Sequence, residues 1–184
     1  MQGSVIWLTG LPSSGKTTLG KALAKTLNDN GISVEVLDGD EIRESLSADL
    51  GFSAEDRKTH AERVIYVAKL LSRNGVQVIV PLISPYRETR DLARKQLPQF
   101  FEVYVKCSVS ECIRRDVKGL YAKALSGEIG EFTGISDPYE EPINPDLVLD
   151  TEHLDESECV RQIQDTLIHL GKLKFEPADM RNND

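Results

Sequence analysis

The stretch GLPSSGKT, residues 10–17, matches the pattern G-x-x-x-x-G-K-[ST] in full. An apolar run at Val5–Leu8 precedes it, and Leu19, Leu23 and Leu27 follow it at helical spacing. A strand, a glycine-rich loop and a helix in this order predict a phosphate-binding loop rather than a chance glycine-rich turn.

Each residue type in this loop has a chemical reason. Gly10 and Gly15 allow the backbone to wrap closely around phosphate oxygens, so that its N–H groups face the β-phosphate. Lys16 adds a positive charge across the β- and γ-phosphates, which makes it a catalytic candidate, and the Thr17 hydroxyl is suited to bind Mg²⁺. We therefore expect ATP and Mg²⁺ as cofactors, with ATP bound by Gly10, Leu11, Pro12, Ser13, Ser14, Gly15, Lys16, Thr17 and Thr18.

A second apolar run, Val34–Leu37, ends in Asp38-Gly39-Asp40. Carboxylates at the carboxyl end of a parallel strand lie at the ligand-binding edge of the sheet. One acid can hold Mg²⁺ through its waters, and the other can accept the proton of an attacking hydroxyl. We predict that Asp38 and Asp40 are catalytic and metal-binding, with Asp40 nearest the hydroxyl. The alternative is a solvated turn in which an Asp caps a helix.

The rest of the chain repeats the strand–helix alternation. Valine and isoleucine dominate several of five short apolar runs, as a sheet buried on both faces requires, and the segments between them have helical spacing. This pattern predicts an α/β protein, a three-layer P-loop fold with a parallel five-stranded sheet and helices on both faces. The predicted strands are 4–9, 33–37, 76–83, 101–107 and 147–150. A capping box at Ser53 and Asp56 predicts a helix to about Arg73, ended by Asn74-Gly75.

We expect one kinase domain at residues 1–175 and a polar tail at 176–184. Residues 119–145 break the strand–helix pattern with four glycines and three prolines. An irregular stretch of this length in a compact domain is usually a functional lid, which we place at about 118–140.

Composition limits the function classes. The net charge of −8 argues against a general nucleic-acid binder, although residues 57–95 carry nine basic side chains that can form a local anion-binding surface. No apolar run approaches the roughly 20 residues that span a membrane, and no signal peptide is evident, so we expect a cytoplasmic protein without a membrane partner. The cysteines, Cys107, Cys112 and Cys159, have no metal-ligand spacing and are expected to be reduced and buried.

A regulatory GTPase is the alternative from another class, because it shares the phosphate loop. The guanine motif N-K-x-D does not occur in the sequence. The one D-x-x-G match, Asp116–Gly119, follows a predicted helix instead of closing a strand. A kinase is therefore favoured, and a preference for ATP over GTP would support it.

Seven motifs together resemble one family, the adenylylsulfate kinases. They occur in the family's order: GLPSSGKTTL, LDGDEIR, DLGFSAEDR, LISPYR, RDVKGLY, GEIGEFTGI and DPYEEP. The resemblance covers nearly the whole chain, and no sulfurylase-like extension flanks it, so we expect the free-standing kinase.

The resemblance implies that ATP phosphorylates the ribose 3′-hydroxyl of adenosine 5′-phosphosulfate (APS), giving 3′-phosphoadenosine 5′-phosphosulfate and ADP in sulfate assimilation. It also implies a nucleoside-monophosphate-kinase-like fold and a homodimer. Other small-molecule P-loop kinases, of the gluconate or shikimate type, are the alternative enzymes, and they lack an adenine sandwich.

The resemblance assigns further residues to the site. Arg43 and Arg57 would hold the phosphosulfate anion, Phe52 and Phe132 would sandwich the adenine, and Arg115 would touch ATP. The full substrate-binding set is Asp40, Arg43, Phe52, Arg57, His60, Ile83, Ser84, Lys118, Phe132 and Thr133.

Ser84 is counted with the catalytic residues, but in-line transfer needs no phosphoenzyme, so we expect it to bind rather than react. From spacing alone, the two phenylalanines could be core residues, Arg57 a solvated helix residue and Ser84-Pro85 a simple turn.

One position departs from the family pattern. His60 stands where the family has a substrate-facing Asn, three residues after Arg57 and therefore on the same helix face. A histidine can donate a hydrogen bond as an asparagine does, so we expect activity to survive with altered affinity and pH dependence. The alternative is an ordinary surface histidine.

Overall fold

The computed structural model describes residues 2–97 and 99–173. Its centre is a parallel five-stranded sheet with the strand order β2-β3-β1-β4-β5. The strands are β1 (Val5–Thr9), β2 (Val34–Val36), β3 (Gln77–Pro81), β4 (Phe100–Lys106) and β5 (Leu147–Asp150). The five predicted strands are confirmed, with β4 beginning one residue earlier than the apolar pattern indicated.

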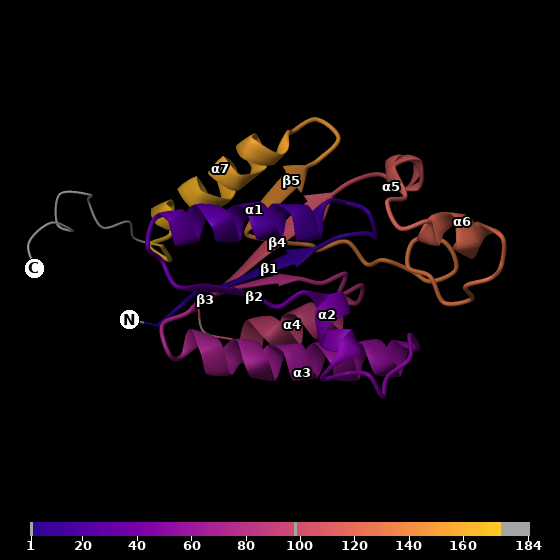
Figure 1. The fold of residues 1–184 in the computed structure, drawn as a ribbon, viewed down its shortest axis with the longest axis horizontal. Helices are drawn as coiled ribbons and strands as arrows, with labels where there is room; N and C mark the ends of the chain where they lie inside the picture. The colour runs from indigo at the N-terminus through magenta and orange to yellow at the C-terminus, as the bar shows by residue number, and fades with distance from the viewer. Residues whose placement is uncertain (1, 98, 174–184) are drawn as a thin grey trace, which may run out of the picture.

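Helices cover both faces of the sheet, as Figure 1 shows. One face carries α1 (Lys16–Asp29) and α7 (Glu156–His169), which pack on each other; the other carries α2 (Gly39–Glu44), α3 (Ala54–Ser72) and α4 (Arg87–Gln96). Two short helices, α5 (Val109–Arg115) and α6 (Leu120–Leu125), lie beyond the carboxyl ends of the strands. The predicted three-layer architecture is therefore confirmed.

Strand β1 shows why the sheet sequences are continuously apolar. Ile6 and Leu8 belong to the core beneath α1 and α7, whereas Val5 and Trp7 belong to the core beneath α3 and α4. Successive side chains of a strand point to opposite faces, and here both faces are covered, so all four are fully buried.

The position of β1 also determines where ligands bind. It lies between β3 and β4, so the strand order reverses at this strand. In open parallel sheets, ligands bind outside the carboxyl ends of the strands at such a reversal. The loop at residues 10–17 follows β1 directly at this point.

The predicted start and end of the long helix α3 are confirmed. Ser53 Oγ accepts a hydrogen bond from the Asp56 N–H at 3.2 Å and donates one to Asp56 Oδ2 at 2.7 Å. The helix ends at Ser72, and Gly75 follows with a φ of 87°, in the left-handed region that favours glycine.

The segment that connects α5 to β5 is less irregular than expected. It contains the short helix α6, whose first amides are held by the Asp116 carboxylate: the N–H groups of Tyr121 and Ala122 each donate to it at 3.0 Å. The inner side of α6 packs on a small cluster around Leu11 of the phosphate loop. The segment that was predicted to be a lid is therefore attached to the phosphate loop by side-chain packing.

The three cysteines are free and buried, as expected. Within the described residues, no helix is both long and apolar enough to cross a membrane. The predicted polar tail at 176–184 lies outside the described residues.

Candidate active site

The two glycines of the phosphate loop are required for different reasons. Gly15 has a φ of 101° immediately before α1, where a side chain would be strained. Gly10 passes so close to β4 that a Cβ at this position would lie 2.4 Å from the Val105 carbonyl oxygen. Glycine is therefore needed at position 15 because of the backbone conformation, and at position 10 because of the close approach of β4.

Lys16 begins α1, and its side chain is folded into the loop. Its Nζ donates a hydrogen bond to the Leu11 carbonyl at 2.6 Å and lies 3.4 Å from Ser14 Oγ. Burial lowers the pKa of Lys16 to about 8, because the charged amine loses hydration. A phosphate beside the amine would favour its charged form, so phosphate binding and protonation of Lys16 reinforce each other.

Thr17 and Asp38 meet across the sheet edge. Thr17 Oγ1 donates to Asp38 Oδ2 at 3.1 Å, and Asp38 Oδ1 accepts from the Asp40 N–H at 2.9 Å, which caps α2. A hydroxyl and a carboxylate fit Mg²⁺, which binds few protein oxygens and takes its others from water and phosphate. No group of three or more His, Cys, Asp or Glu side chains suited to a metal occurs in the part of the chain that the structure describes.

Asp40 connects the sheet edge to the start of the predicted lid through an ion pair with Lys118. This hydrogen bond to Asp40 raises the pKa of Lys118. The two side chains are 69% and 62% exposed, and exposed ion pairs contribute little to stability. Opening this ion pair would therefore cost the fold little stability.

Three residues form a group between α2 and the start of α3: Phe52, which is exposed, and Arg43 and Arg57, which are half-buried. The guanidinium carbons of Arg43 and Arg57 lie 4.5 Å and 5.7 Å from the centroid of the Phe52 ring. Arg57 also donates across to the Glu131 carbonyl in the lid at 2.9 Å. Burial and the neighbouring Arg57 lower the pKa of Arg43. This Arg43–Phe52–Arg57 group presents two cations and an aromatic ring together, and Arg57 is more than a solvated helix residue.

The structure places Phe132 in different surroundings from Phe52. Phe52 is 57% exposed, whereas Phe132 is 7% exposed and packs edge-on against Tyr121 with the ring centroids 4.9 Å apart. Thr133, the next residue, is buried, and its hydroxyl has no hydrogen-bond partner among residues 2–97 and 99–173. Stacking of the two phenylalanines on one adenine stays a prediction.

His60 lies beneath the acidic segment rather than on the surface. It is 2% exposed, and a Cβ built on Gly39 would lie 3.8 Å from its Nε2. Neither ring nitrogen has a hydrogen-bond partner in the described part of the chain. Burial and then the cations Arg43 and Arg63 lower the pKa of His60 to about 4. The alternative of a surface histidine is therefore wrong.

The corner after β3 carries Ile83 and Ser84. The Ile83 carbonyl accepts from Thr9 Oγ1 at 2.8 Å, next to the phosphate loop. Ser84 Oγ accepts from Trp7 Nε1 at 3.0 Å and donates to the Leu82 carbonyl at 3.2 Å. Because its one hydroxyl proton is engaged within the protein, this geometry favours a supporting role for Ser84 over a nucleophilic one.

Other contacts could not be anticipated from the sequence. Tyr121 of the lid donates from its hydroxyl to the Pro12 carbonyl of the phosphate loop at 3.0 Å. Thr151, after β5, donates from Oγ1 to the Ser14 carbonyl at 3.0 Å, and Arg115 donates to the Thr151 carbonyl at 2.6 Å. Arg115 is thereby fixed near the loop, as its assignment to ATP requires. Tyr121 and Thr151 lie outside any phosphate-binding pattern, and only their contacts identify them.

This fold and site define a class. A phosphate loop at the reversal of a parallel sheet, with Lys16 in its curl and two carboxylates beside Thr17, is typical of P-loop kinases, which transfer phosphate from ATP to a small molecule. In agreement, Asp116 follows α5 and does not close a strand, as a regulatory GTPase would require.

Comparisons with known proteins identify the family. The model of the adenylylsulphate kinase family matches residues 2–150, and the chain belongs to this family. An adenylyl-sulfate kinase of Chloroflexus aurantiacus is 52% identical over 91% of this chain and 90% of its own. The adenylylsulfate kinase activity of the chain follows, and it is an ATP-dependent phosphotransferase.

Solved structures agree. A Mycobacterium tuberculosis APS kinase, solved in complex with AMPPNP and APS, has a TM-score of 0.88 and 45% identity, covering 91% of this chain and 98% of its own. A gluconokinase of Sinorhizobium meliloti has a TM-score of 0.61 at 21% identity over 92% of this chain and 93% of its own, which shows the shared fold alone.

Proposed function

We propose that this chain transfers the γ-phosphate of ATP to the ribose 3′-hydroxyl of APS, giving 3′-phosphoadenosine 5′-phosphosulfate and ADP. The observation that carries the proposal is the pairing of Asp40 with Lys118 of the lid, beside the contact between Thr17 and Asp38. These contacts support the proposal, because Asp40 could exchange its exposed partner Lys118 for an acceptor hydroxyl close to Thr17 and Asp38.

The roles of the phosphate-side residues follow from their contacts. Lys16 and the loop amides bind the β- and γ-phosphates, and Arg115 supports ATP from the side of β5. Thr17 and Asp38 would hold Mg²⁺, which supplies positive charge against the phosphate oxygens when bound. Asp40 releases Lys118, orients the 3′-hydroxyl and accepts its proton.

The substrate side is assigned in the same way. Arg43 and Arg57 bind the phosphosulfate, and the exposed ring of Phe52 stacks on the adenine, with Phe132 on the lid side. The lid at about 118–140, which includes Lys118 and Thr133, closes over both nucleotides and excludes water. The substrate-binding set also includes His60, Ile83 and Ser84.

A direct assay tests the proposal. Purified protein is given ATP, Mg²⁺ and APS, and formation of ADP and of the 3′-phosphorylated product is measured; gluconate, shikimate and AMP serve as control acceptors, and GTP as the control donor. Of the four acceptors, we expect only APS to be phosphorylated, and we expect ATP to be a better phosphate donor than GTP. Turnover of a control acceptor in preference to APS would contradict the proposed substrate.

We also propose a homodimer in the cytoplasm, in line with the family resemblance. Light scattering coupled to size-exclusion chromatography would test the oligomeric state, and a monomer at micromolar concentration would contradict it.

A further inference from the structure

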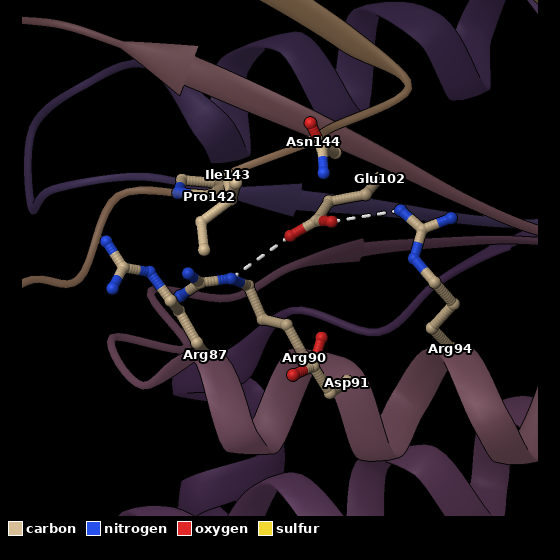
Figure 2. Close-up of a pocket in the computed structure, with 8 residues that line it drawn as sticks. All are labelled: Arg87, Arg90, Asp91, Arg94, Glu102, Pro142, Ile143 and Asn144. Atoms are coloured by element: carbon tan, nitrogen blue, oxygen red, sulfur yellow. Dashed lines mark hydrogen bonds and ion pairs between the residues drawn. The ribbon is translucent and has the colours of Figure 1, made fainter.

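A buried arginine belongs to α4, on the face of the sheet opposite α1 and α7. Figure 2 shows Arg90 of α4 and Arg94, one helical turn later, on either side of Glu102 from β4. Arg90 Nε and Arg94 Nη2 each lie 3.0 Å from a carboxylate oxygen of Glu102. The Arg90 and Glu102 side chains are 2% and 8% exposed, whereas Arg94 is 39% exposed. A buried ion pair has a large desolvation cost and is often no more stabilising than an apolar pair.

Arg90 uses its other two nitrogens on the backbone of two separate segments. Nη1 donates to the Ser84 carbonyl at 2.5 Å, and Nη2 donates to the Glu140 carbonyl. One planar, rigid guanidinium therefore fixes the corner after β3 relative to Glu140, at the carboxyl end of the predicted lid. Glu102 holds the guanidinium in the orientation that both hydrogen bonds need.

We name residues 137–144 the strap. It overlaps the last residues of the predicted lid and leads towards β5. Packing holds its Tyr139, whose ring stacks on Tyr104 with the centroids 6.1 Å apart, and hydrogen bonds hold the rest. The Tyr139 hydroxyl lies 2.8 Å from Thr9 Oγ1, the Glu140 N–H donates to the Pro85 carbonyl at 2.9 Å, and Arg87 Nε donates to the Glu141 carbonyl at 2.8 Å. The strap is thus held at the edge of the substrate site by hydrogen bonds.

Packing contributes less to holding the carboxyl-terminal half of the strap than it does at Tyr139. Pro142, Ile143 and Asn144 line a cavity of about 420 Å³ together with the arginines, and Ile143 is 73% exposed. A segment that borders a cavity lacks close-packed neighbours on that side. The hydrogen bonds from Arg90 and Arg87 to the carbonyls of Glu140 and Glu141 are therefore the main restraint on this half of the strap.

We propose that Arg90 is a positioning residue that fixes the carboxyl end of the lid against the Ile83–Ser84 corner, and so sets the affinity for APS without touching it. This inference rests on the proposed function. Arg90 contacts Ser84 and Glu140 directly, the strap begins four residues after Thr133, and neither segment touches the amine of Lys16. Its loss should therefore act on APS binding and leave ATP binding intact.

Paired substitutions separate positioning from stability. Arg90→Met leaves Glu102 buried and without its inner partner, so we expect a lower Tm and roughly a tenfold higher KM for APS. In Arg90→Met/Glu102→Leu no buried charge is left unpaired, so the Tm should recover while the KM for APS stays about tenfold high and the KM for ATP changes less than twofold. Recovery of both the Tm and the KM for APS would overturn the proposal.

Two single variants complete the design. Arg94→Met removes the other partner of Glu102 but no contact to the strap, so it should leave the KM for APS within twofold of the wild type. Arg90→Lys keeps the charge, but its single ammonium cannot reproduce the three-way geometry, so it should fail to restore the KM. An Arg94→Met effect equal to that of Arg90→Met would show that charge balance, not positioning, matters.

Hydrogen exchange of the substrate-free protein makes the test independent of the substrate. Amides of the strap, including the Glu140 N–H, should exchange faster in Arg90→Met/Glu102→Leu, while those of α7 should not change. Unchanged exchange in the strap would overturn the proposal whatever the acceptor is. If exchange rises but the wild type does not phosphorylate APS, the proposed function fails and the positioning role of Arg90 stands.

Discussion

The phosphate loop and the Arg43–Phe52–Arg57 group lie at the same edge of the sheet but are built in opposite ways. The loop is one continuous stretch of chain, and its Lys16 is buried. Its phosphate-binding groups are mainly backbone N–H groups. The other group combines one exposed ring with two half-buried arginines from two helices and a connection. Its Arg57 reaches the predicted lid through the Glu131 carbonyl. A preformed backbone site suits ATP phosphates. Side chains that hold one another until a ligand arrives suit the substrate that we propose, bound beneath the predicted lid.

The largest effect should come from the preformed side. Lys16→Ala removes the positive charge that stabilises the transferred phosphoryl group, so we expect kcat to fall by a factor on the order of 10² or more. Lys21→Ala, which changes an exposed lysine on the same helix, is the matched control and should leave kcat unchanged. Steady-state kinetics with saturating ATP and APS measure both. A near-normal kcat in Lys16→Ala would contradict the catalytic role of the phosphate loop on which the comparison of the two regions rests.

The acids of the segment after β2 join the two regions, and they should respond differently to substitution. Asp40→Asn keeps the shape but loses the proton acceptor and the charge, so kcat should fall by about 10²-fold or more, with little change in ATP affinity. Asp38→Asn should instead weaken the response to Mg²⁺, because Asp38 contacts Thr17 of the loop. A Mg²⁺ titration of kcat measures both effects.

Glu41→Gln, at an exposed neighbouring carboxylate, is the control for the acid variants. The assignment is reversed if Asp38→Asn abolishes turnover at saturating Mg²⁺ while Asp40→Asn is mild. Such a result would place the reacting hydroxyl on the phosphate-loop side of the segment.

The same contrast explains what the sequence could predict. The loop is contiguous, and each of its residues has a fixed chemical reason, so its pattern alone predicted its place after β1. The parallel sheet followed from apolar runs buried on both faces. The ion pair of Asp40 with Lys118, 78 positions apart, depends on how α2 and the lid approach each other, which no local pattern specifies.

Burial of single residues was also beyond local patterns. The spacing of His60 is compatible with either face of α3, and only the packing of α2 over it decides that it is buried. Helix α6 was missed because its six residues lie among glycines, and its start depends on a carboxylate cap at Asp116. The role of Arg90 was not foreseen, because its contacts join α4, β4 and the strap.

The two phenylalanines offer a smaller effect that sharpens the comparison. Phe52→Ala removes an exposed ring, so the KM for APS should rise without a change in Tm; a stacking contribution of about 1–3 kcal/mol corresponds to roughly 5- to 150-fold. Phe132→Ala should raise that KM and also lower the Tm, because the ring packs on Tyr121. KM values for both substrates and thermal melts measure this. Equal losses of APS and ATP affinity in Phe52→Ala would contradict a role confined to the substrate.

The smallest effect concerns His60, and it tests whether water is excluded from the ring beneath the segment that carries Asp38 and Asp40. The folded pKa of about 4 lies below the ordinary value of about 6.5, so between these values the unfolded chain binds more protons than the folded one. The contribution of His60 to the free energy of unfolding should therefore be fully present above pH 6.5 and decrease toward pH 4, with a slope of up to about 1.4 kcal/mol per pH unit.

His60→Asn should remove this part of the pH dependence, and His169→Asn, at an exposed position, should not. Urea unfolding of the three proteins between pH 7 and pH 4.5 measures the difference, and subtracting the variant from the wild type cancels the carboxylates that also titrate there. If the free energy of unfolding depends on pH in the same way for the wild type and His60→Asn, water reaches the imidazole ring. The segment that carries Asp38 and Asp40 would then pack on a hydrated side chain rather than on a neutral, buried imidazole.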